Sequence, residues 1–262
     1  MSRARSTGFT AASVTRAVPP FTQPPIVIGG CARSGSTLLL SVLSCHSRIF
    51  AIKKETNTLA TAKRNREPGT FRPRPLKLDR LARQLEKAKA RAPGSCHRWC
   101  EKTPKNVLSF GAILEAFGKN VRLIHMVRDG RDVVTSIHPG KPERFWVTKD
   151  RWVLDVSVGL AFADHPQVLT VKYEDLTRNY PATISTICDF LDEEVESSFF
   201  AYPDAATIKT SGAWFSPALP VHSESIERWK APEYTAVIDD FMRDLRAAQL
   251  LQRLGYLPTR EA

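Results

Sequence analysis

A glycine-bounded loop between two apolar segments constrains the fold more than any other feature of this chain. The stretch Ile26-Val-Ile-Gly-Gly-Cys-Ala-Arg-Ser-Gly-Ser-Thr-Leu38 begins as an apolar run typical of a buried strand, and residues 38–43 are typical of a following helix. Gly30 and Gly35 occupy the two glycine positions of the phosphate-binding pattern G-x-x-x-x-G-K-[ST]. Backbone N–H groups and the positive end of a helix can hold a phosphate in such a loop.

The loop departs from that pattern at the position of its lysine. Ser36 stands where the lysine is expected, and the basic residue lies inside the loop, at Arg33. The usual lysine reaches the β- and γ-phosphates of a nucleoside triphosphate. We therefore expect the ligand to be a phosphorylated nucleotide that is not used as a triphosphate.

The rest of the chain alternates apolar strand patterns with amphipathic helix patterns, which favours an α/β fold in which helices cover both faces of a mostly parallel sheet. Further strands are predicted at 48–52, 121–127 and 168–173. Helices are predicted at 76–90, 106–117 with Asn106 as a possible cap, 129–136, 143–163, 181–191 and 233–254, the last ending near Gly255. Residues 63–75 and 203–225 are predicted as irregular segments. We expect one domain over residues 25–262, preceded by a mobile tail over residues 1–24.

The positive charge of the chain is concentrated in one segment. The formal net charge is +11, and the segment Lys53–Lys105, with 16 Lys and Arg against 5 Asp and Glu, carries an excess of the same size. Nucleic-acid binding is one explanation, but aromatic residues for base stacking are sparse there. Attraction of an anionic small ligand or of an acidic acceptor explains the charge equally well.

The cysteines and the hydropathy of the chain indicate its cellular compartment and argue against disulfides, a metal site and a membrane span. The five cysteines are odd in number and mostly scattered, which argues against a disulfide framework and favours a reducing, cytoplasmic compartment. Cys96 and Cys100 flank His97, but further zinc ligands at suitable spacing are missing nearby, so no metal is predicted. No apolar run approaches the ~20 residues that cross a bilayer, so no membrane partner is expected, and the sequence leaves the oligomeric state open.

Two motifs in order along the chain resemble those of the sulfotransferases that use 3′-phosphoadenosine 5′-phosphosulfate. Gly30-Cys-Ala-Arg-Ser-Gly-Ser-Thr-Leu38 resembles the 5′-phosphosulfate loop of that family, and Leu123-Ile-His-Met-Val-Arg-Asp-Gly-Arg-Asp-Val-Val-Thr-Ser136 resembles its 3′-phosphate motif. The pattern is most similar to the tyrosylprotein sulfotransferases and their bacterial relatives. Shorter matches are Lys54-Glu-Thr56, Cys100-Glu-Lys-Thr-Pro104, Val171-Lys-Tyr-Glu-Asp-Leu176, Glu227-Arg-Trp229 and Leu254-Gly-Tyr256.

This resemblance implies a P-loop NTPase-like sulfotransferase fold and a donor that is held at both of its anionic ends. Arg33 and the loop around Ser34 would hold the 5′ end, and Arg128 with Ser136 would hold the 3′-phosphate, since a guanidinium donates two parallel hydrogen bonds to a phosphate. By resemblance, Tyr173 and Arg228 would also contact the nucleotide. The full set of implied donor-binding residues is Arg33, Ser34, Gly35, Ser36, Thr37, Arg128, Ser136, Tyr173 and Arg228.

The resemblance also implies which residues carry out the transfer to an acceptor hydroxyl. The candidate catalytic residues are Glu55 as the base, Lys102 as the cation that neutralises the leaving oxygen, and Arg33. Other sulfotransferases use a histidine base, so His46 and His97 stay as alternatives. His125, inside an apolar strand, is more typical of a core histidine with its hydrogen bonds satisfied, and His138 also lies near the motifs.

Four differences from the tyrosylprotein pattern leave the acceptor open: a tyrosyl, sugar or natural-product hydroxyl. No segment reads as a membrane anchor, and Ala51-Ile52 stand where a cysteine would pair with Cys100. Pro139-Gly140 replace a further basic phosphate contact, although Lys141 follows, and Glu55 lies one residue further from the loop. Two other functions remain as alternatives, a P-loop nucleotide kinase and a basic nucleic-acid-binding protein.

Overall fold

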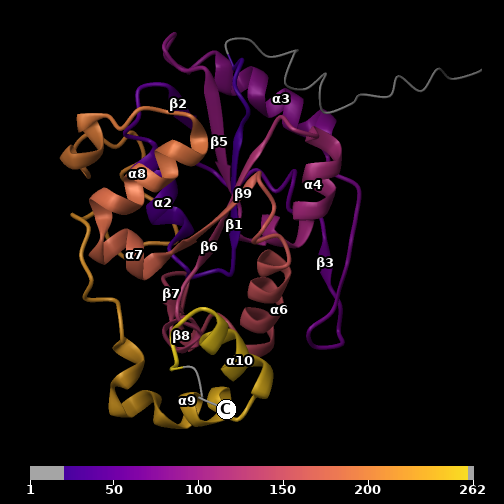
Figure 1. Cartoon of the computed structure of the whole chain (residues 1–262), viewed down its shortest axis with the longest axis vertical. Helices are drawn as coiled ribbons and strands as arrows, with labels where there is room; N and C mark the ends of the chain where they lie inside the picture. The colour runs from indigo at the N-terminus through magenta and orange to yellow at the C-terminus, as the bar shows by residue number, and fades with distance from the viewer. Residues whose placement is uncertain (1–20, 259–262) are drawn as a thin grey trace, which may run out of the picture.

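A five-stranded parallel sheet forms the centre of the computed structural model, which describes residues 21–258 (Figure 1). Its strands are β1 (Ile26–Gly30), β2 (Ile49–Ala51), β5 (Arg98–Lys102), β6 (Arg122–Val127) and β9 (Val168–Lys172), in the order β2-β5-β1-β6-β9. All five residues of β1 are buried, as expected for the central strand of a parallel sheet that is covered on both faces. The predicted α/β class and parallel sheet are confirmed.

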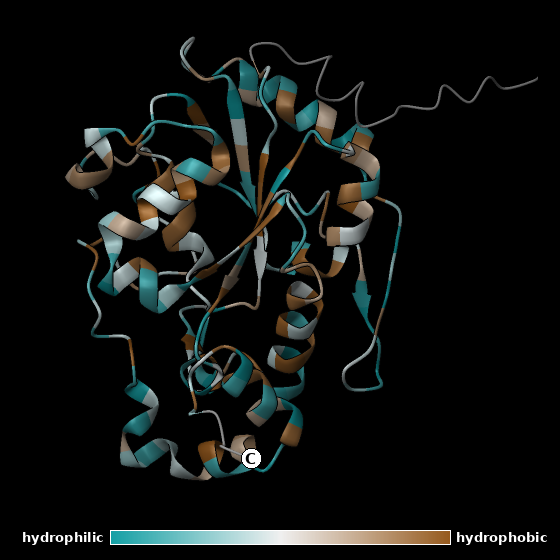
Figure 2. Ribbon diagram, viewed as in Figure 1, coloured by the Kyte–Doolittle hydropathy of each residue, from teal (hydrophilic) through white to brown (hydrophobic). Residues whose placement is uncertain are grey.

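Helices cover both faces of this sheet and bury two separate apolar clusters against it (Figures 1 and 2). One face carries α2 (Ser36–Leu43), α7 (Tyr173–Arg178) and α8 (Tyr180–Leu191), followed by the 3₁₀ turn η2 (Ser197–Ala201). The other face carries α3 (Leu78–Lys89), η1 (Pro104–Ser109), α4 (Phe110–Phe117) and part of α6 (Lys149–Leu160). Successive strands are therefore joined by helices that cross the sheet, which is how parallel strands connect.

A third apolar cluster lies beyond the carboxyl end of β6 and is closed by the last helices of the chain. It joins α6 to α5 (Gly130–Val134), α9 (Thr235–Met242) and α10 (Leu245–Arg253), with the turns η3 (Arg228–Lys230) and η4 (Pro232–Tyr234) leading in. Figure 1 shows α9 and α10 at the opposite end of the molecule from α3. The segment from η3 to α10 thus returns to the edge of the sheet where the strands end.

The predicted long helix over residues 143–163 is wrong. Residues Ile137–His138 and Lys141–Phe145 pair as the antiparallel strands β7 and β8, and α6 begins only at Lys149. The side chain of Thr148 caps α6 by accepting a hydrogen bond from the Arg151 N–H at 3.3 Å. The residues of β8 are all exposed, so the periodicity across them did not reflect a buried helix face.

Three smaller predictions of local structure also need correction. Asn106 caps no helix but lies inside η1, where its amide donates to the Ile28 carbonyl at 3.1 Å. The predicted helix over 233–254 is two helices, because Asp244 caps α10 by accepting from the Arg246 N–H at 3.0 Å. The segment 63–75 contains the short antiparallel strands β3 (Lys63–Arg64) and β4 (Phe71–Arg72). Gly255, with φ of 74°, follows α10 as predicted.

Strand β5 was not predicted because its sequence, Arg-Trp-Cys-Glu-Lys, is largely charged, and it is mostly hydrophilic in colour in Figure 2. Each of its charged side chains has an ionic or hydrogen-bonding partner. Arg98 lies 3.1 Å from the Glu193 carboxylate, and both side chains are buried. Glu101 is fully buried and accepts hydrogen bonds from Thr56, Thr103 and Asn106. Burial nevertheless raises the pKa of Glu101 above its usual value.

Most of the predicted tail, residues 1–20, lies outside the described residues. Phe21 is buried in the cluster of α3 and α4, and the Gln23 N–H donates to the His97 carbonyl at 3.0 Å. All five cysteines are buried and free. Within residues 21–258 no helix has the length and apolarity needed to cross a bilayer, and no three His, Cys, Asp or Glu side chains are grouped to hold a metal ion.

Candidate active site

A cavity of about 640 Å³ opens at the carboxyl ends of four neighbouring strands. Lys102 ends β5, Arg128 follows β6, Tyr173 follows β9, and the loop containing Arg33 follows β1; all four residues line the cavity. The carboxyl edge of the strands is where open α/β sheets bind their ligands. The same four strand ends carried the sequence motifs, so the fold brings those motifs to one place.

The loop after β1 has a backbone that only certain residues allow. Gly35 has φ of 86°, and a Cβ atom there would lie 2.4 Å from the ring of Tyr173. Glycine at this position therefore lets the loop approach the residue that follows β9. Arg33 also adopts a positive φ, 71°, although it is not a glycine. Ser36 then begins α2, whose N-terminal N–H groups face the loop.

Arg33 lies close to other cationic side chains. Its Nη1 donates to the Ala213 carbonyl at 2.8 Å. Burial lowers the pKa of Arg33, and the nearby Arg128 and Arg228 lower it further. Mutual repulsion among partly buried guanidinium groups is relieved when an anion binds between them. The arrangement therefore favours an anionic ligand.

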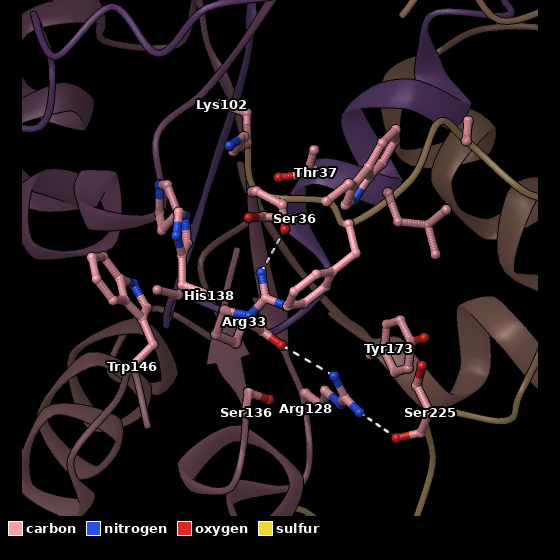
Figure 3. Close-up of a pocket in the computed structure, with 18 of the residues that line it drawn as sticks. Arg33, Ser36, Thr37, Lys102, Arg128, Ser136, His138, Trp146, Tyr173 and Ser225 are labelled. Atoms are coloured by element: carbon pink, nitrogen blue, oxygen red, sulfur yellow. Dashed lines mark hydrogen bonds between the residues drawn. The ribbon is translucent and has the colours of Figure 1, made fainter. Parts of the chain in front are cut away.

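Arg128 is held rigidly against the end of the sheet (Figure 3). It is 9% exposed, and its guanidinium lies 4.5 Å from the centre of the Tyr173 ring, within the range of a cation–π interaction. Its Nη1 donates to the Arg33 carbonyl at 3.3 Å, and its Nη2 donates to the Ser225 carbonyl. In Figure 3, Lys102, Ser36 and Thr37 lie at one end of the cavity, and Arg128, Ser136 and Tyr173 lie at the other, with Arg33 between them.

Asp132 joins the motif after β6 to a segment almost one hundred residues later. Its two carboxylate oxygens accept the N–H groups of Glu227 at 2.9 Å and Trp229 at 3.1 Å. The residue between them is Arg228, which lines the cavity. Burial raises the pKa of Asp132, while Arg128, 3.8 Å away, opposes that rise. The buried carboxylate thus fixes the backbone that carries Arg228.

Glu55 and Lys102 form an ion pair at the other end of the cavity. Lys102 Nζ lies 2.7 Å from Glu55 Oε1, and the lysine side chain is 6% exposed while the glutamate side chain is 42% exposed. The ammonium group has three donors, so contact with one carboxylate oxygen leaves two N–H groups for another ligand. The glutamate side chain lines the cavity and is partly exposed, so a second molecule can reach its carboxylate.

The structure brings together most of the residues predicted from the sequence. All three candidate catalytic residues line the cavity, as do eight of the nine donor-binding candidates: Arg33, Gly35, Ser36, Thr37, Arg128, Ser136, Tyr173 and Arg228. The exception is Ser34, whose side chain is fully buried, does not line the cavity and has no hydrogen-bond partner within the described residues. Ser136 does line it, and its hydroxyl donates to the Asp132 carbonyl at 2.6 Å.

Of the four histidines near the motifs, His138 lines the cavity and the other three do not. His46 and His97 lie outside the cavity, with His97 held 2.8 Å from Glu193 Oε1. His125 is a core histidine as expected, but its hydrogen bonds are not satisfied: both ring nitrogens are buried without a partner in the described chain. His138 lines the cavity and stacks on Trp146 with ring centroids 4.5 Å apart. Burial, followed by the charge of Arg33, lowers the pKa of His138.

Several cavity residues carried no recognisable signal in the sequence. Trp146 lines the cavity, whereas Trp152 is fully buried in the core. Three further basic residues, Arg64, Lys105 and Arg151, and the irregular segment 213–222 complete the wall. Only tertiary packing brings these residues to the strand ends, so motif spacing alone could not identify them.

Comparison with known proteins gives a family and a fold. The model of the Sulfotransferase family matches residues 24–197. No curated protein sequence matches the chain. Among solved structures, the sulfotransferase domain of the Synechococcus PCC 7002 olefin synthase is similar with a TM-score of 0.61 and 18% identity, covering 90% of this chain and 97% of that one.

Two further structures share the fold. The sulfotransferase domain of the curacin biosynthetic pathway is similar with a TM-score of 0.56 and 18% identity over 90% of this chain and 98% of that one. Mouse sulfotransferase SULT7A1, solved as a complex with PAP, gives 0.53 and 14% identity over 94% of each chain. Together with the family model, which matches well over half of the sequence, the cavity at the strand ends leads to one conclusion: this chain belongs to the sulfotransferase family.

Proposed function

We propose that the protein transfers a sulfuryl group from 3′-phosphoadenosine 5′-phosphosulfate to the hydroxyl of an acceptor. The observation that carries this proposal is the division of the cavity into two cationic ends. Arg33 and Lys102 lie near the loop after β1, and Arg128 lies with Ser136 at the end of β6. A nucleotide with an anionic group at both its 5′ and 3′ positions needs two separate anion sites.

The proposed donor fits the residues at each end. The loop and the N-terminus of α2 supply N–H groups for the 5′-phosphosulfate, and Ser36 and Thr37 add hydroxyl donors. Arg128, Ser136 and Arg228 would hold the 3′-phosphate. Tyr173, which packs on Arg128 at that end, would contact the nucleoside.

The transfer step follows from the position of Glu55 and Lys102. The acceptor oxygen forms a bond to sulfur while the bond between sulfur and the bridging 5′-phosphate oxygen breaks, and the leaving nucleotide keeps that electron pair. Lys102 would neutralise the charge that develops on the bridging oxygen, and Glu55 would take the hydroxyl proton. A free glutamate with a pKa near ~4.3 is a weak base toward a phenol near ~10, so the proton has to move late, after the new bond has begun to form.

Binding measurements test this proposal directly. Calorimetry of the purified protein should show at least about tenfold tighter binding of adenosine 3′,5′-bisphosphate than of adenosine 5′-phosphate, because charge-assisted bonds to the added phosphate are lost in the second ligand. Arg128→Gln should remove that preference. Equal affinity for the two nucleotides in the unaltered protein would contradict the proposal.

The two alternative functions make different predictions. A nucleotide kinase would bind ATP better than the bisphosphate and would lose its activity when Mg²⁺ is chelated. Ser36 at the position of the loop lysine and Arg128 directly after β6 speak against that function. A nucleic-acid-binding protein would bind DNA or RNA with a steep dependence on salt.

A further inference from the structure

A second cavity, of about 370 Å³, adjoins the first one and is lined almost entirely by the basic segment. Its wall consists of Asn57, Ala60, Thr61, Lys63, Arg74, Pro75, Lys77 and Lys105. Two hydrogen bonds fix the segments that form it: the Thr61 hydroxyl donates to the Arg74 carbonyl at 2.9 Å, and the Lys77 N–H donates to the Thr58 carbonyl at 3.0 Å. Hydrogen bonds within the segment that precedes α3 therefore hold the wall of this cavity in place.

The charges around this second cavity are unbalanced. Four of its eight wall residues are basic and none is acidic. Within residues 21–258, none of these four side chains has a carboxylate oxygen within 4.0 Å. The neighbouring Arg64 differs sharply, because its Nη2 lies 2.5 Å from the buried carboxylate of Asp155. The fold supplies a counter-charge to Arg64 and leaves the cations of the second cavity without one.

The pKa of Lys105 reflects the same excess of positive charge. Burial lowers its pKa, and Arg64, Lys63, Lys77 and Arg151 each lower it further. Cations that destabilise one another in this way are stabilised when an anionic group binds among them.

The two cavities adjoin each other and share part of their walls. Asn57 and Lys105 line both of them, and these residues follow Glu55 and Lys102 by two and three positions. Lys63 and Arg64 are successive residues of β3, so their side chains leave opposite faces, Lys63 lining the second cavity and Arg64 the first. An acceptor whose hydroxyl lies at Glu55 would reach the second cavity by passing Asn57 and Lys105, which line both.

We infer that the second cavity is a binding site for an anionic group of the acceptor, so that the substrate class is a hydroxyl compound carrying a carboxylate or similar small anion. This inference rests on the proposed function, since it places the acceptor hydroxyl at Glu55. The donor does not require the site, because the first cavity already provides cations for both of its anionic ends. A nucleic-acid groove is disfavoured, because the wall contains no aromatic residue on which a base could stack.

Calorimetry with the donor site saturated by adenosine 3′,5′-bisphosphate tests the inference. Two matched pairs of probes distinguish the source of the anion: the amidated peptide acetyl-Glu-Tyr-Glu against acetyl-Gln-Tyr-Gln, and digalacturonic acid against its dimethyl ester. In at least one pair the charged member should bind about tenfold more tightly than the neutral member, as expected for charge-assisted hydrogen bonds. The pair that shows the difference identifies a peptide or a sugar acid as the source.

Two triple variants with the same change in net charge locate the effect. K63Q/R74Q/K77Q should abolish the preference for the charged probe, whereas R80Q/R83Q/K87Q, which alters exposed residues of α3 outside both cavities, should keep it. Equal loss in both variants, or no preference in the unaltered protein while bisphosphate binding is intact, would overturn the subsite alone. Failure of the unaltered protein to prefer adenosine 3′,5′-bisphosphate over adenosine 5′-phosphate would overturn the proposed function and the inference built on it.

Discussion

Lys102 Nζ lies 2.7 Å from Glu55 Oε1, so the only carboxylate of residues 21–258 that lines the larger cavity lies against the last residue of β5. The pair is asymmetric, because the lysine is buried and the glutamate is open to the cavity. Removal of the lysine charge therefore leaves a solvated carboxylate, whereas removal of the glutamate charge leaves a buried ammonium group. The two substitutions are expected to have different consequences for folding and for chemistry.

Lys102→Met should slow the transfer step while leaving nucleotide affinity largely intact. An electrostatic contact that is made mainly in the transition state typically contributes about 100- to 1000-fold in kcat. The measurement is kcat at saturating donor, with calorimetry of adenosine 3′,5′-bisphosphate on the same protein. Lys149→Met, which removes an exposed ion pair with Asp240, is the control and should leave both quantities unchanged. A collapse of bisphosphate affinity with kcat preserved would refute the assigned role.

Glu55→Gln should lower kcat by about 100-fold or more, the usual contribution of a general base. Glutamine is the appropriate replacement because its carbonyl oxygen can still accept a hydrogen bond from the buried Lys102. His138→Ala tests the competing base in the same cavity and should raise the acceptor KM with little effect on kcat, since the imidazole packs on Trp146. If His138→Ala abolished turnover and Glu55→Gln did not, the histidine would be the base.

Asp132→Asn should weaken recognition of the 3′-phosphate although the residue touches no ligand in this scheme. An asparagine has one acceptor oxygen for the two N–H groups of Glu227 and Trp229, so the backbone around Arg228 would lose one of its anchors. We expect the ratio of affinities for adenosine 3′,5′-bisphosphate and adenosine 5′-phosphate to fall by about tenfold, equivalent to one lost buried hydrogen bond. Asp240→Asn is the exposed control, and an equal loss for both nucleotides would indicate a general structural defect instead.

The elements that could be predicted from the sequence are those whose own residues explain their burial. Strands β1, β6 and β9 are largely apolar runs. Arg33 lies in the loop after β1 and Arg128 directly follows β6, so the sheet and its ligand edge could be derived from local patterns. Strand β5 could not, because Glu101 is buried by partners as distant along the chain as Thr56. Local patterning contains no information about such partners.

The residues of the candidate site also fall into those that could be predicted from the sequence and those that could not. Its motif residues were predicted because they match the motifs of the family that the sequence resembles, and Arg33 and Arg128 also lie after predicted strands. Trp146 and Lys105 were not, because the hairpin of β7 and β8 and the turn η1 reach the cavity only through tertiary packing. The role of Asp132 was equally hidden, since nothing in the sequence indicates that its carboxylate binds the backbone of residues 227–229.

His125→Leu should make the protein less sensitive to acid. The ring is fully buried beside Gly159 of α6, its two nitrogens have no partner within the described residues, and burial lowers its pKa to about 3. The unfolded chain, with a histidine pKa near ~6.5, takes up a proton below that pH, whereas the folded chain does not until the pH approaches its own lower value. The stability that neutral His125 contributes is therefore complete above the unfolded pKa and is lost as the pH falls.

Urea unfolding at several pH values between 7 and 4.5 measures this effect. Relative to His125→Leu, the free energy of unfolding of the unaltered protein should fall by about 1.4 kcal/mol for each pH unit below ~6.5. Carboxyl groups are common to both proteins and cancel in the difference. Ile124→Val, at the preceding residue of β6, introduces no change in titratable groups and should follow the unaltered protein. Parallel curves for His125→Leu and the unaltered protein would mean that the buried ring accepts a proton as readily in the folded state as in the unfolded one.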